Sequence, residues 1–236
     1  MNAARFVAET DDVFGRIAQR YDLLCDVFSL CIHRLWKARL ASLIASSPAK
    51  LILDVASGTG DIPQRVRRQA DGLPGRRIVV SDLSAAMLTV ARRKLGESAS
   101  VEYAILDAHR LDSIASGSVD LYSIAFGLKI CDRRKVLAEA FRVLRPGGVF
   151  LSLEAARIPL DWLHSLYLGY MDWCLPVIAR IATGGDRSAY DYLLRGIHDF
   201  PAPSELAREI ASHGFTAVSY QRLTFGIVAL HRAVKP

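Results

Sequence analysis

Between about residue 50 and residue 154, short apolar runs alternate with longer segments in which apolar residues recur at helical spacing. Such alternation is typical of repeated strand-helix-strand units around a parallel sheet. The pattern predicts strands over Lys50–Ala56, Arg77–Ser81, Ser100–Leu106, Val119–Phe126 and Val149–Glu154. It predicts helices over Ile62–Ala70, Ala85–Leu95 and Arg133–Leu144, the last of them stopped by Pro146-Gly147-Gly148. These elements form the doubly wound core of an α/β protein.

The two ends of the chain differ from this core. Thr216–Leu223 and Phe225–Val234 have the pattern of two strands joined by a tight turn, which must pair antiparallel. Asp11–Ser46 is predicted to be helical. We therefore predict one domain with a seven-stranded, mostly parallel sheet. Its parts are N-terminal helices (1–46), the core (47–154), a helical insert (155–212) and an antiparallel C-terminal hairpin (213–236).

The insert contains a helix with two neighbouring apolar stripes. The first stripe is Trp162, Leu166, Tyr170, Trp173 and Val177, and the second is Leu163, Tyr167, Met171, Cys174 and Ile178. Such a helix either packs between the core and another helix or forms a lid over a hydrophobic substrate. We do not expect it to span a membrane, because polar residues interrupt it at Asp161, His164, Asp172 and Arg180.

Composition limits the class of protein further. The chain has 236 residues, of which 51% are hydrophobic and 23% charged, so it can bury a sizeable core and is not a disordered or disulfide-scaffold protein. Its four cysteines form no CxxC pair, so we expect reduced thiols in a cytoplasmic protein and no metal site. The N-terminal segment has no basic region followed by an apolar run, so we expect no signal peptide. The net charge is +6, but the basic pairs are scattered, which favours a solvated surface over a nucleic-acid interface.

A glycine turn, Gly58-Thr59-Gly60, follows the first predicted strand. Glycines let the backbone turn sharply and approach a ligand closely. The dinucleotide fingerprint requires a third glycine where this chain has Pro63. The carboxylates of Asp54 and Asp61 would also repel a pyrophosphate. They favour a cationic ligand, so we expect S-adenosylmethionine, with its sulfonium and amino groups, rather than NAD.

Two more carboxylates end the next strands. Asp82 precedes Leu83 at the end of the second strand, where an acidic side chain accepts both hydroxyls of a ribose. Asp107 ends the third strand, so that its carboxylate and the N–H of Ala108 are placed to bind an adenine edge. Each carboxylate alone fits a helix cap or a turn equally well. Together they meet at the crevice where such sheets bind ligands, and they predict a cofactor site.

Several further segments carry a resemblance to a known family. They are Arg20-Tyr21-Asp22, the segment Ile32–Lys37, the glycine loop Leu53–Asp61, Phe126-Gly127-Leu128, the segment Phe141–Gly148 and the tail Leu223–Arg232. The chain resembles a class I S-adenosylmethionine-dependent methyltransferase, and more narrowly the ubiquinone/menaquinone biosynthesis C-methyltransferase family (UbiE/MenG type). The resemblance implies a Rossmann-like class I methyltransferase fold and C-methylation of a hydroquinone or phenolic ring of a quinone precursor. It implies cofactor contacts at Thr59, Asp82, Asp107 and Ala108, and Ala125 stands where the family has a serine.

The chain departs from the family where the substrate would bind. The family follows Phe-Gly-Leu with Arg-Asn, and that arginine is implied to help deprotonate the substrate phenol; here the pair is Lys129-Ile130. Lys129 retains the positive charge without the planar fork, and it is our first catalytic candidate, although it fits a solvated surface lysine equally well. Tyr21, His33 and His231 are further candidates as hydrogen-bond partners or proton acceptors, and each fits a packed structural role.

These departures keep other functions open. The alternative is O- or N-methylation of another small hydrophobic aromatic metabolite, and a non-catalytic binding subunit on the same fold is a further one. A nucleic-acid methyltransferase is disfavoured, because strand four is followed neither by an Asp/Asn-Pro-Pro-aromatic motif nor by a nucleophilic cysteine. The expected partners are a small hydrophobic aromatic substrate and the inner membrane face in peripheral contact, with no nucleic acid. Self-association as a homodimer stays open.

Overall fold

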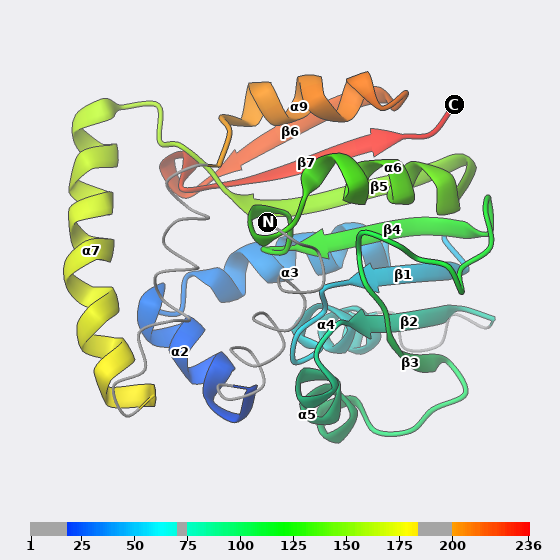
Figure 1. The fold of residues 1–236 in the computed structure, drawn as a ribbon, viewed down its shortest axis with the longest axis horizontal. Coiled ribbons are helices and arrows are strands. Elements are labelled where there is room, and N and C mark those ends of the chain that lie inside the picture. The colour runs from blue at the N-terminus through cyan, green and yellow to red at the C-terminus, as the bar shows by residue number, and fades with distance from the viewer. Residues whose placement is uncertain (1–17, 70–74, 184–199) are drawn as a thin grey trace.

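A seven-stranded sheet runs through the molecule in the order β3-β2-β1-β4-β5-β7-β6 (Figure 1). The computed structural model describes residues 18–69, 75–183 and 200–236. The strands are β1 Leu51–Val55, β2 Arg77–Asp82, β3 Val101–Ile105, β4 Val119–Ala125, β5 Leu144–Ala155, β6 Thr216–Leu223 and β7 Val228–Val234. Only β7 runs antiparallel to both of its neighbours within this sheet, and β1 to β5 pair in parallel. The mostly parallel seven-stranded sheet that the sequence predicts is confirmed.

Helices precede the sheet and connect its strands. The N-terminal helices are η1 Ala18–Arg20, α2 Tyr21–Phe28 and α3 His33–Ala45. The connections contain α4 Asp61–Gln69, α5 Ala85–Leu95, η2 Leu128–Ile130, α6 Arg133–Val143, α7 Asp161–Thr183, α9 Pro203–Ser212 and η3 Thr224–Gly226. Side chains cap α5 and α6: the Ser84 hydroxyl accepts from Met87 N at α5, and the Asp132 carboxylate accepts from Arg134 N at α6. The helix predicted for 11–17 lies outside the described residues.

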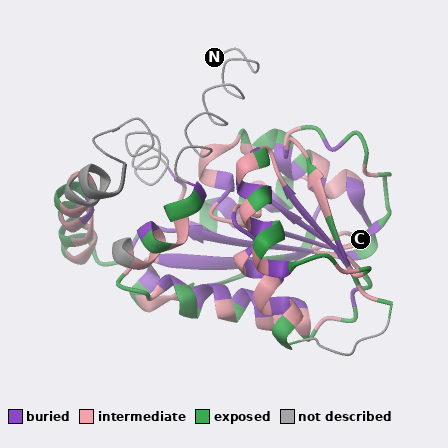
Figure 2. Ribbon diagram, turned by 90° about the horizontal axis from the view of Figure 1, so that it is seen from below, coloured by how far each residue is buried: buried purple, intermediate pink, exposed green. Residues whose placement is uncertain are grey.

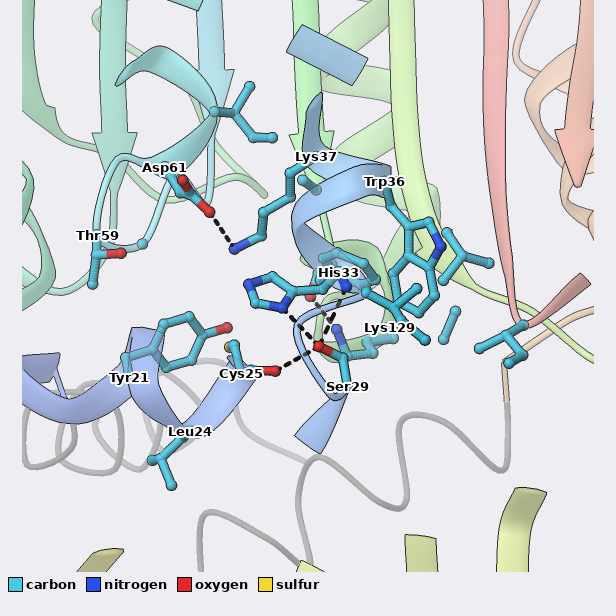
Figure 3. Close-up of a pocket in the computed structure, with 18 of the residues that line it drawn as sticks. Tyr21, Leu24, Cys25, Ser29, His33, Trp36, Lys37, Thr59, Asp61 and Lys129 are labelled. Carbon is cyan, nitrogen blue, oxygen red and sulfur yellow. Dashed lines mark hydrogen bonds and ion pairs between the residues drawn. The ribbon is translucent and has the colours of Figure 1, made fainter. Parts of the chain in front are cut away.

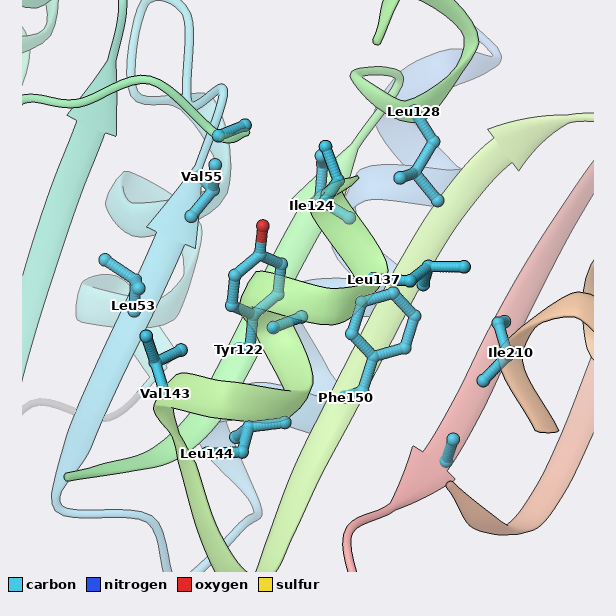
Figure 4. Close-up of a cluster of buried hydrophobic side chains, with 14 of the residues drawn as sticks. Leu53, Val55, Tyr122, Ile124, Leu128, Leu137, Val143, Leu144, Phe150 and Ile210 are labelled. Atoms are coloured by element: carbon cyan, nitrogen blue, oxygen red, sulfur yellow. The ribbon is translucent and has the colours of Figure 1, made fainter. Parts of the chain in front are cut away.

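Alternate residues of the central strands face two separate apolar clusters, as the period of a strand requires. On one face, Ile52 of β1 and Leu121 of β4 pack with side chains of α3, α4 and α5. On the other face, Leu53 and Tyr122 pack with α6 and α9 (Figure 4). The rings of Tyr122 and Phe150 stack there with centroids 5.6 Å apart. The central strands are therefore buried on both faces (Figure 2), which fixes the ends of β1 and β4 in space.

Two strand boundaries differ from the expectations. The tight turn expected after Leu223 is the turn η3, so β7 begins at Val228 instead of Phe225. Thr224, Phe225 and Gly226 have φ values of 45°, 56° and 94°, and residues in this left-handed region cannot continue an extended strand. β5 begins at Leu144 instead of Val149, because Leu144 pairs with Val119 directly after α6 ends.

The long helix α7 lies at one side of the molecule, in contact with α2 (Figure 1). One line of its side chains points outward, with Trp162, Leu166 and Trp173 exposed by 67%, 65% and 76%. Met171, on the opposite side of the helix, is buried. In the described structure the helix is therefore packed on one side and exposed along this line, and its role as a lid stays a prediction. Within the described residues, no helix has the length and apolarity needed to cross a bilayer.

Candidate active site

The glycine turn after β1 has the backbone that its residues predict. Gly58 and Gly60 have φ values of 55° and 75°, and Ala56 before them has 51°. A Cβ atom on Gly60 would lie 2.7 Å from Leu95 Cδ1, so this glycine permits the close packing of α5. A Cβ atom on Gly58 would meet only Tyr21 Cε1, at 4.0 Å, so the space above Gly58 is open. Gly58 therefore leaves space at the two cavities described next, whereas Gly60 permits helix packing and lines neither of them.

Two cavities adjoin this turn at the carboxyl ends of the central strands. The first has a volume of about 320 Å³ and the second about 80 Å³. They share five lining residues, Tyr21, Ala56, Gly58, Ala125 and Phe126, which we call the shared wall. The crevice that the strand order predicts is thus divided into two compartments that meet at the glycine turn.

The second cavity contains the predicted ribose and adenine residues. Asp82, Leu83, Asp107, Ala108 and Ala125 all line it, with apolar side chains that include Met87 and Ile130. The carboxylate of Asp82 bridges two loops, since Oδ2 accepts from Gly58 N at 2.8 Å and Oδ1 from Ser84 N at 2.9 Å. This fixes the orientation of the carboxylate at the cavity wall.

Asp107 is held by a residue that the sequence reasoning missed. His109 N and His109 Nδ1 both lie within hydrogen-bond distance of Asp107 Oδ1, at 2.9 Å and 2.7 Å. His109 Nε2 accepts from Asp132 N at 2.9 Å, so Nδ1 carries the proton and donates to Asp107. His109 therefore links the end of β3 to the first turn of α6. A histidine two positions after Asp107 is the signal that could have identified it.

The carboxylate of Asp54 is buried beneath the turn. Its oxygens accept hydrogen bonds from Ser57 Oγ at 2.7 Å and from Ser123 Oγ at 2.5 Å. Burial raises the pKa of Asp54 to about 6, against the opposing effect of the two serine hydroxyls. Asp54 lines the first cavity, but its immediate role is to hold β1, β4 and the turn together.

The first cavity is mainly apolar and lies between the sheet and the helices α2, α3 and α7 (Figure 3). Tyr167 and Met171 of α7 contribute to its wall from the side opposite the exposed line of that helix, and Tyr170 contributes from a position between the two. Other lining side chains are Leu24, Ile32, Trp36, Ile62 and Ile227. Its size and lining suit a small aromatic molecule with an apolar substituent.

His33 faces this cavity from α3. Its Nδ1 is 2.7 Å from Ser29 Oγ, and its Nε2 is 3.7 Å from Asp26 Oδ1. Burial, supported by the charge of Lys37, lowers the pKa of His33 to about 4. The imidazole is neutral at pH 7 and is a weak proton acceptor there. His231, the other histidine candidate, lies outside both cavities, where its Nε2 donates to the Pro203 carbonyl at 2.9 Å.

Lys37 is a buried cation of the first cavity that the sequence reasoning did not single out. It stands four residues after His33, on the same face of α3. Its Nζ is 2.9 Å from Asp61 Oδ2, and Arg65 Nε is 3.0 Å from Asp61 Oδ1. Burial would raise the pKa of Asp61, but these two cations outweigh burial and lower it. Asp61 therefore remains an anion beside the glycine turn.

Helix α2 covers the turn with Tyr21 and Asp22. Interaction with the Cys25 side chain and burial hold the pKa of Tyr21 well above its usual range, so its hydroxyl keeps its proton at neutral pH. Thr59 Oγ1 donates to Asp22 Oδ1 at 2.6 Å, and Lys94 pairs with the other oxygen of Asp22. The predicted cofactor contact Thr59 is thus also the point where α2 is attached to the turn.

Lys129 is buried at the first cavity and is not a solvated surface lysine. Its Nζ donates to the Phe126 carbonyl at 2.5 Å and lies 4.0 Å from Glu154 Oε2. Burial lowers the pKa of Lys129, while the charge of Glu154 opposes this shift. The structure therefore places this predicted cation at the first cavity and adds its carboxylate neighbour, and its catalytic role stays a prediction.

The fold places the molecule among known methyltransferases. It is similar to a SAM-dependent methyltransferase of Thermotoga maritima, described as a possible histamine N-methyltransferase, with a TM-score of 0.65, 15% identity and coverage of 96% of this chain and 99% of that one. It is also similar to phosphoethanolamine N-methyltransferase 2 of Haemonchus contortus, solved with S-adenosylhomocysteine, with a TM-score of 0.58, 19% identity and coverage of 84% and 52%. The fold is that of the class I methyltransferases.

Sequence relatives narrow this class. Residues 3–235 match the model of the ubiE/COQ5 methyltransferase family. The chain is 40% identical to the mitochondrial 2-methoxy-6-polyprenyl-1,4-benzoquinol methylase of Schizosaccharomyces pombe, covering 95% of this chain and 78% of that protein. It is 41% identical to the ubiquinone/menaquinone biosynthesis C-methyltransferase UbiE of Acidiphilium cryptum, covering 93% and 88%. The chain therefore belongs to the ubiE/COQ5 methyltransferase family.

Proposed function

We propose that the chain transfers a methyl group from S-adenosylmethionine to a ring carbon of a hydroquinone precursor of ubiquinone or menaquinone. The observation that carries this proposal is the pair of cavities that meet at the shared wall. One is small and bears carboxylates, and the other is larger, apolar and contains a buried cation. The names of the relatives, a polyprenyl benzoquinol methylase and a quinone-biosynthesis C-methyltransferase, support the choice of ring.

The residues of the second cavity fit the nucleoside part of this cofactor. Asp82 has a fixed carboxylate suited to two ribose hydroxyls, and Asp107 with the N–H of Ala108 suits an adenine edge. Leu83 and Ala125 complete the wall, and the open space above Gly58 leads to the first cavity. Asp54, Thr59 and Asp61 line the first cavity beside that passage. The two carboxylates would attract the positively charged amino group at the methionine end of the cofactor. When bound, the cofactor supplies a methyl group on a positively charged sulfur.

The first cavity would hold the acceptor ring. A phenol is a weak carbon nucleophile until it loses its proton, so the site must favour the phenolate. The ammonium of Lys129 lines the cavity and would stabilise a ring oxygen as an anion, which lowers the pKa of that phenol. Tyr21, at the shared wall, would donate a hydrogen bond toward the same compartment. His33 would orient the ring rather than accept its proton, because its pKa of about 4 makes it a weak base.

The direct test uses labelled S-adenosylmethionine with reduced demethylated quinones and with simple phenols. We expect label in the quinone product, located on a ring carbon by mass spectrometry. Label on oxygen or nitrogen would establish the alternative O- or N-methyltransferase and overturn this proposal. Absence of cofactor binding by calorimetry would instead indicate a non-catalytic protein.

We further propose that α7 contacts a lipid bilayer through its exposed line, Trp162, Leu166 and Trp173, which we call the apolar ridge. The inner side of the same helix lines the first cavity, so contact along the ridge would bring the cavity mouth to the source of a prenylated ring. Tryptophan side chains favour the interface between lipid and water. The flanking Asp161 and Asp172 are exposed acids, so the contact would depend on apolar insertion and not on anionic lipid.

Vesicle co-sedimentation tests this contact. We expect the protein to bind neutral phosphatidylcholine vesicles, with little change when phosphatidylglycerol or salt is added. The double substitution Trp162→Ser and Trp173→Ser should remove binding. The matched control is Ile105→Ser, because Ile105 is 63% exposed at the edge strand β3. The control should bind vesicles as wild type does. If the double variant binds vesicles equally well, the apolar ridge is not the contact. Loss of self-association in the double variant, with vesicle binding intact, would assign the ridge to a second copy of the chain.

A further inference from the structure

The carboxylate of Glu154 is fully buried behind Lys129, at the end of β5. Glu154 lines neither cavity, whereas Lys129 lines the first one. Glu154 Oε1 accepts a hydrogen bond from Leu128 N at 2.6 Å. Among the described residues Oε2 has no hydrogen-bond partner, and the nearest cation to it is Lys129 Nζ at 4.0 Å. Glu154 therefore adjoins Lys129 without itself lining the first cavity.

A buried carboxylate with one oxygen free of hydrogen bonds is costly unless its charge has a function or a partner. Its Oε1 acts as a backbone acceptor for the turn η2, a task that a neutral amide would perform equally well. The free Oε2, directed toward an ammonium, is not explained by that task. The distance of 4.0 Å is longer than a hydrogen bond, so the interaction is one of charge with charge.

The other charged and titratable groups near the pair give Lys129 little other support. Cys25 and Cys131 adjoin it, and burial raises the pKa of both thiols, so they are neutral at pH 7. Lys37 acts on it with the same sign of charge. Arg133 acts on Glu154 more weakly than Lys129 does. Glu154 is therefore the main anion that can hold a charge on Lys129.

We propose that Glu154 is a positioning residue that keeps Lys129 protonated and directed at the oxygen of the acceptor ring. This inference rests on the proposed function, since it concerns the cation assigned there to the substrate phenol. Glu154 does not touch substrate or cofactor and moves no proton itself. It compensates the loss of hydration that Lys129 suffers at the cavity wall.

The burial of both groups agrees with this assignment. Burial raises the pKa of Glu154 to about 7, against the opposing charge of Lys129. Burial lowers the pKa of Lys129, against the opposing charge of Glu154. Each group thus loses hydration and regains part of the lost free energy from the other. Removal of the carboxylate should make Lys129 lose its proton at a lower pH.

The test compares Glu154→Gln, Lys129→Arg and the double variant in the pH dependence of kcat. Glutamine keeps the acceptor for Leu128 N and removes the charge. We expect the alkaline limb of kcat in Glu154→Gln to move to lower pH by about one unit or more, with about a tenfold loss of kcat at pH 8. Arginine stays protonated even without a neighbouring carboxylate. The double variant should therefore have the same alkaline limb of kcat as the single variant Lys129→Arg.

Controls separate this role from a structural one. Glu139→Gln is the matched control, because Glu139 also accepts from a backbone N–H, that of Leu111, and pairs with a cation, Arg142, outside both cavities. It should leave the pH profile unchanged. An unshifted profile in Glu154→Gln, or no rescue by Lys129→Arg, would overturn the inference. Cofactor affinity by calorimetry and the position of the methyl label in wild-type product test the proposed function separately.

Discussion

Thr59 Oγ1 donates a hydrogen bond of 2.6 Å to Asp22 Oδ1, which ties the first turn of α2 to the glycine turn after β1. The second oxygen of Asp22 pairs with Lys94 at the end of α5. Two residues from distant parts of the sequence thus join α2 to the turn that lies beside both cavities. This carboxylate is one of the contacts that hold α2, which also packs against α7 and α3.

Loss of that attachment should weaken cofactor binding. We expect Asp22→Ala to raise the Kd for S-adenosylmethionine about tenfold, a modest effect because the Asp22 side chain is 41% exposed. Isothermal calorimetry measures the change. Asp26→Asn, on the same helix but paired with Arg34, is the control and should leave the Kd unchanged. Equal Kd values for Asp22→Ala and wild type would show that the Asp22 attachment contributes nothing to cofactor binding.

Asp82 should have the largest effect on cofactor affinity. A carboxylate that accepts two ribose hydroxyls contributes two charge-assisted hydrogen bonds, so Asp82→Ala should raise the Kd by about 100-fold or more. The control is Asp112→Ala, an acid 69% exposed and paired with Arg110. Calorimetry on both variants checks the prediction, and an unchanged Kd for Asp82→Ala would move the ribose elsewhere.

Lys129→Ala should reduce the chemical step and leave cofactor binding intact. We expect kcat for a reduced quinone acceptor to fall about 100-fold, because a preorganised charge beside the ring oxygen is lost. Lys135→Ala, an exposed lysine of α6, is the control. Steady-state assays at several pH values provide the measurement. A wild-type rate and pH profile in Lys129→Ala would remove this lysine from the mechanism.

His33 should make the folded state sensitive to acid. Its pKa is about 4 in the folded state and 6.5 without perturbation, so the folded protein favours the neutral imidazole. Stability from this group is fully present above pH 6.5 and is lost as the pH falls through 4. Relative to His33→Gln, wild type should lose free energy of unfolding on the order of 3 kcal/mol across that window. Denaturant titrations of both proteins at several pH values measure the difference between their free energies of unfolding. Asp54 and Glu154 are present in both proteins, so their contributions cancel in this difference. Parallel curves would contradict the assignment.

The sequence predicted the parallel sheet and the positions of Asp82 and Asp107, because strand ends in such a sheet are fixed by its topology. It did not predict the pair formed by Lys129 and Glu154, because that contact depends on side-chain directions after the chain has packed and no spacing along the sequence encodes it. The contact of His109 with Asp107 was also missed, although the two residues stand only two positions apart in the sequence. Lys37 lay within reach of prediction, since its spacing from His33 places both on one helical face. Self-association stays a prediction.

The shared wall has a consequence for how this enzyme can change. Tyr21, Ala56, Gly58, Ala125 and Phe126 form one layer with a different compartment on each side. Under the proposed function, a substitution in this layer would change the Kd for the cofactor and the KM for the acceptor at the same time. Tyr167 and Met171 line only the first cavity, so substitutions there should change the KM and leave the Kd unchanged. We therefore expect the acceptor range to diversify more readily at these residues of α7 than at the ends of β1 and β4.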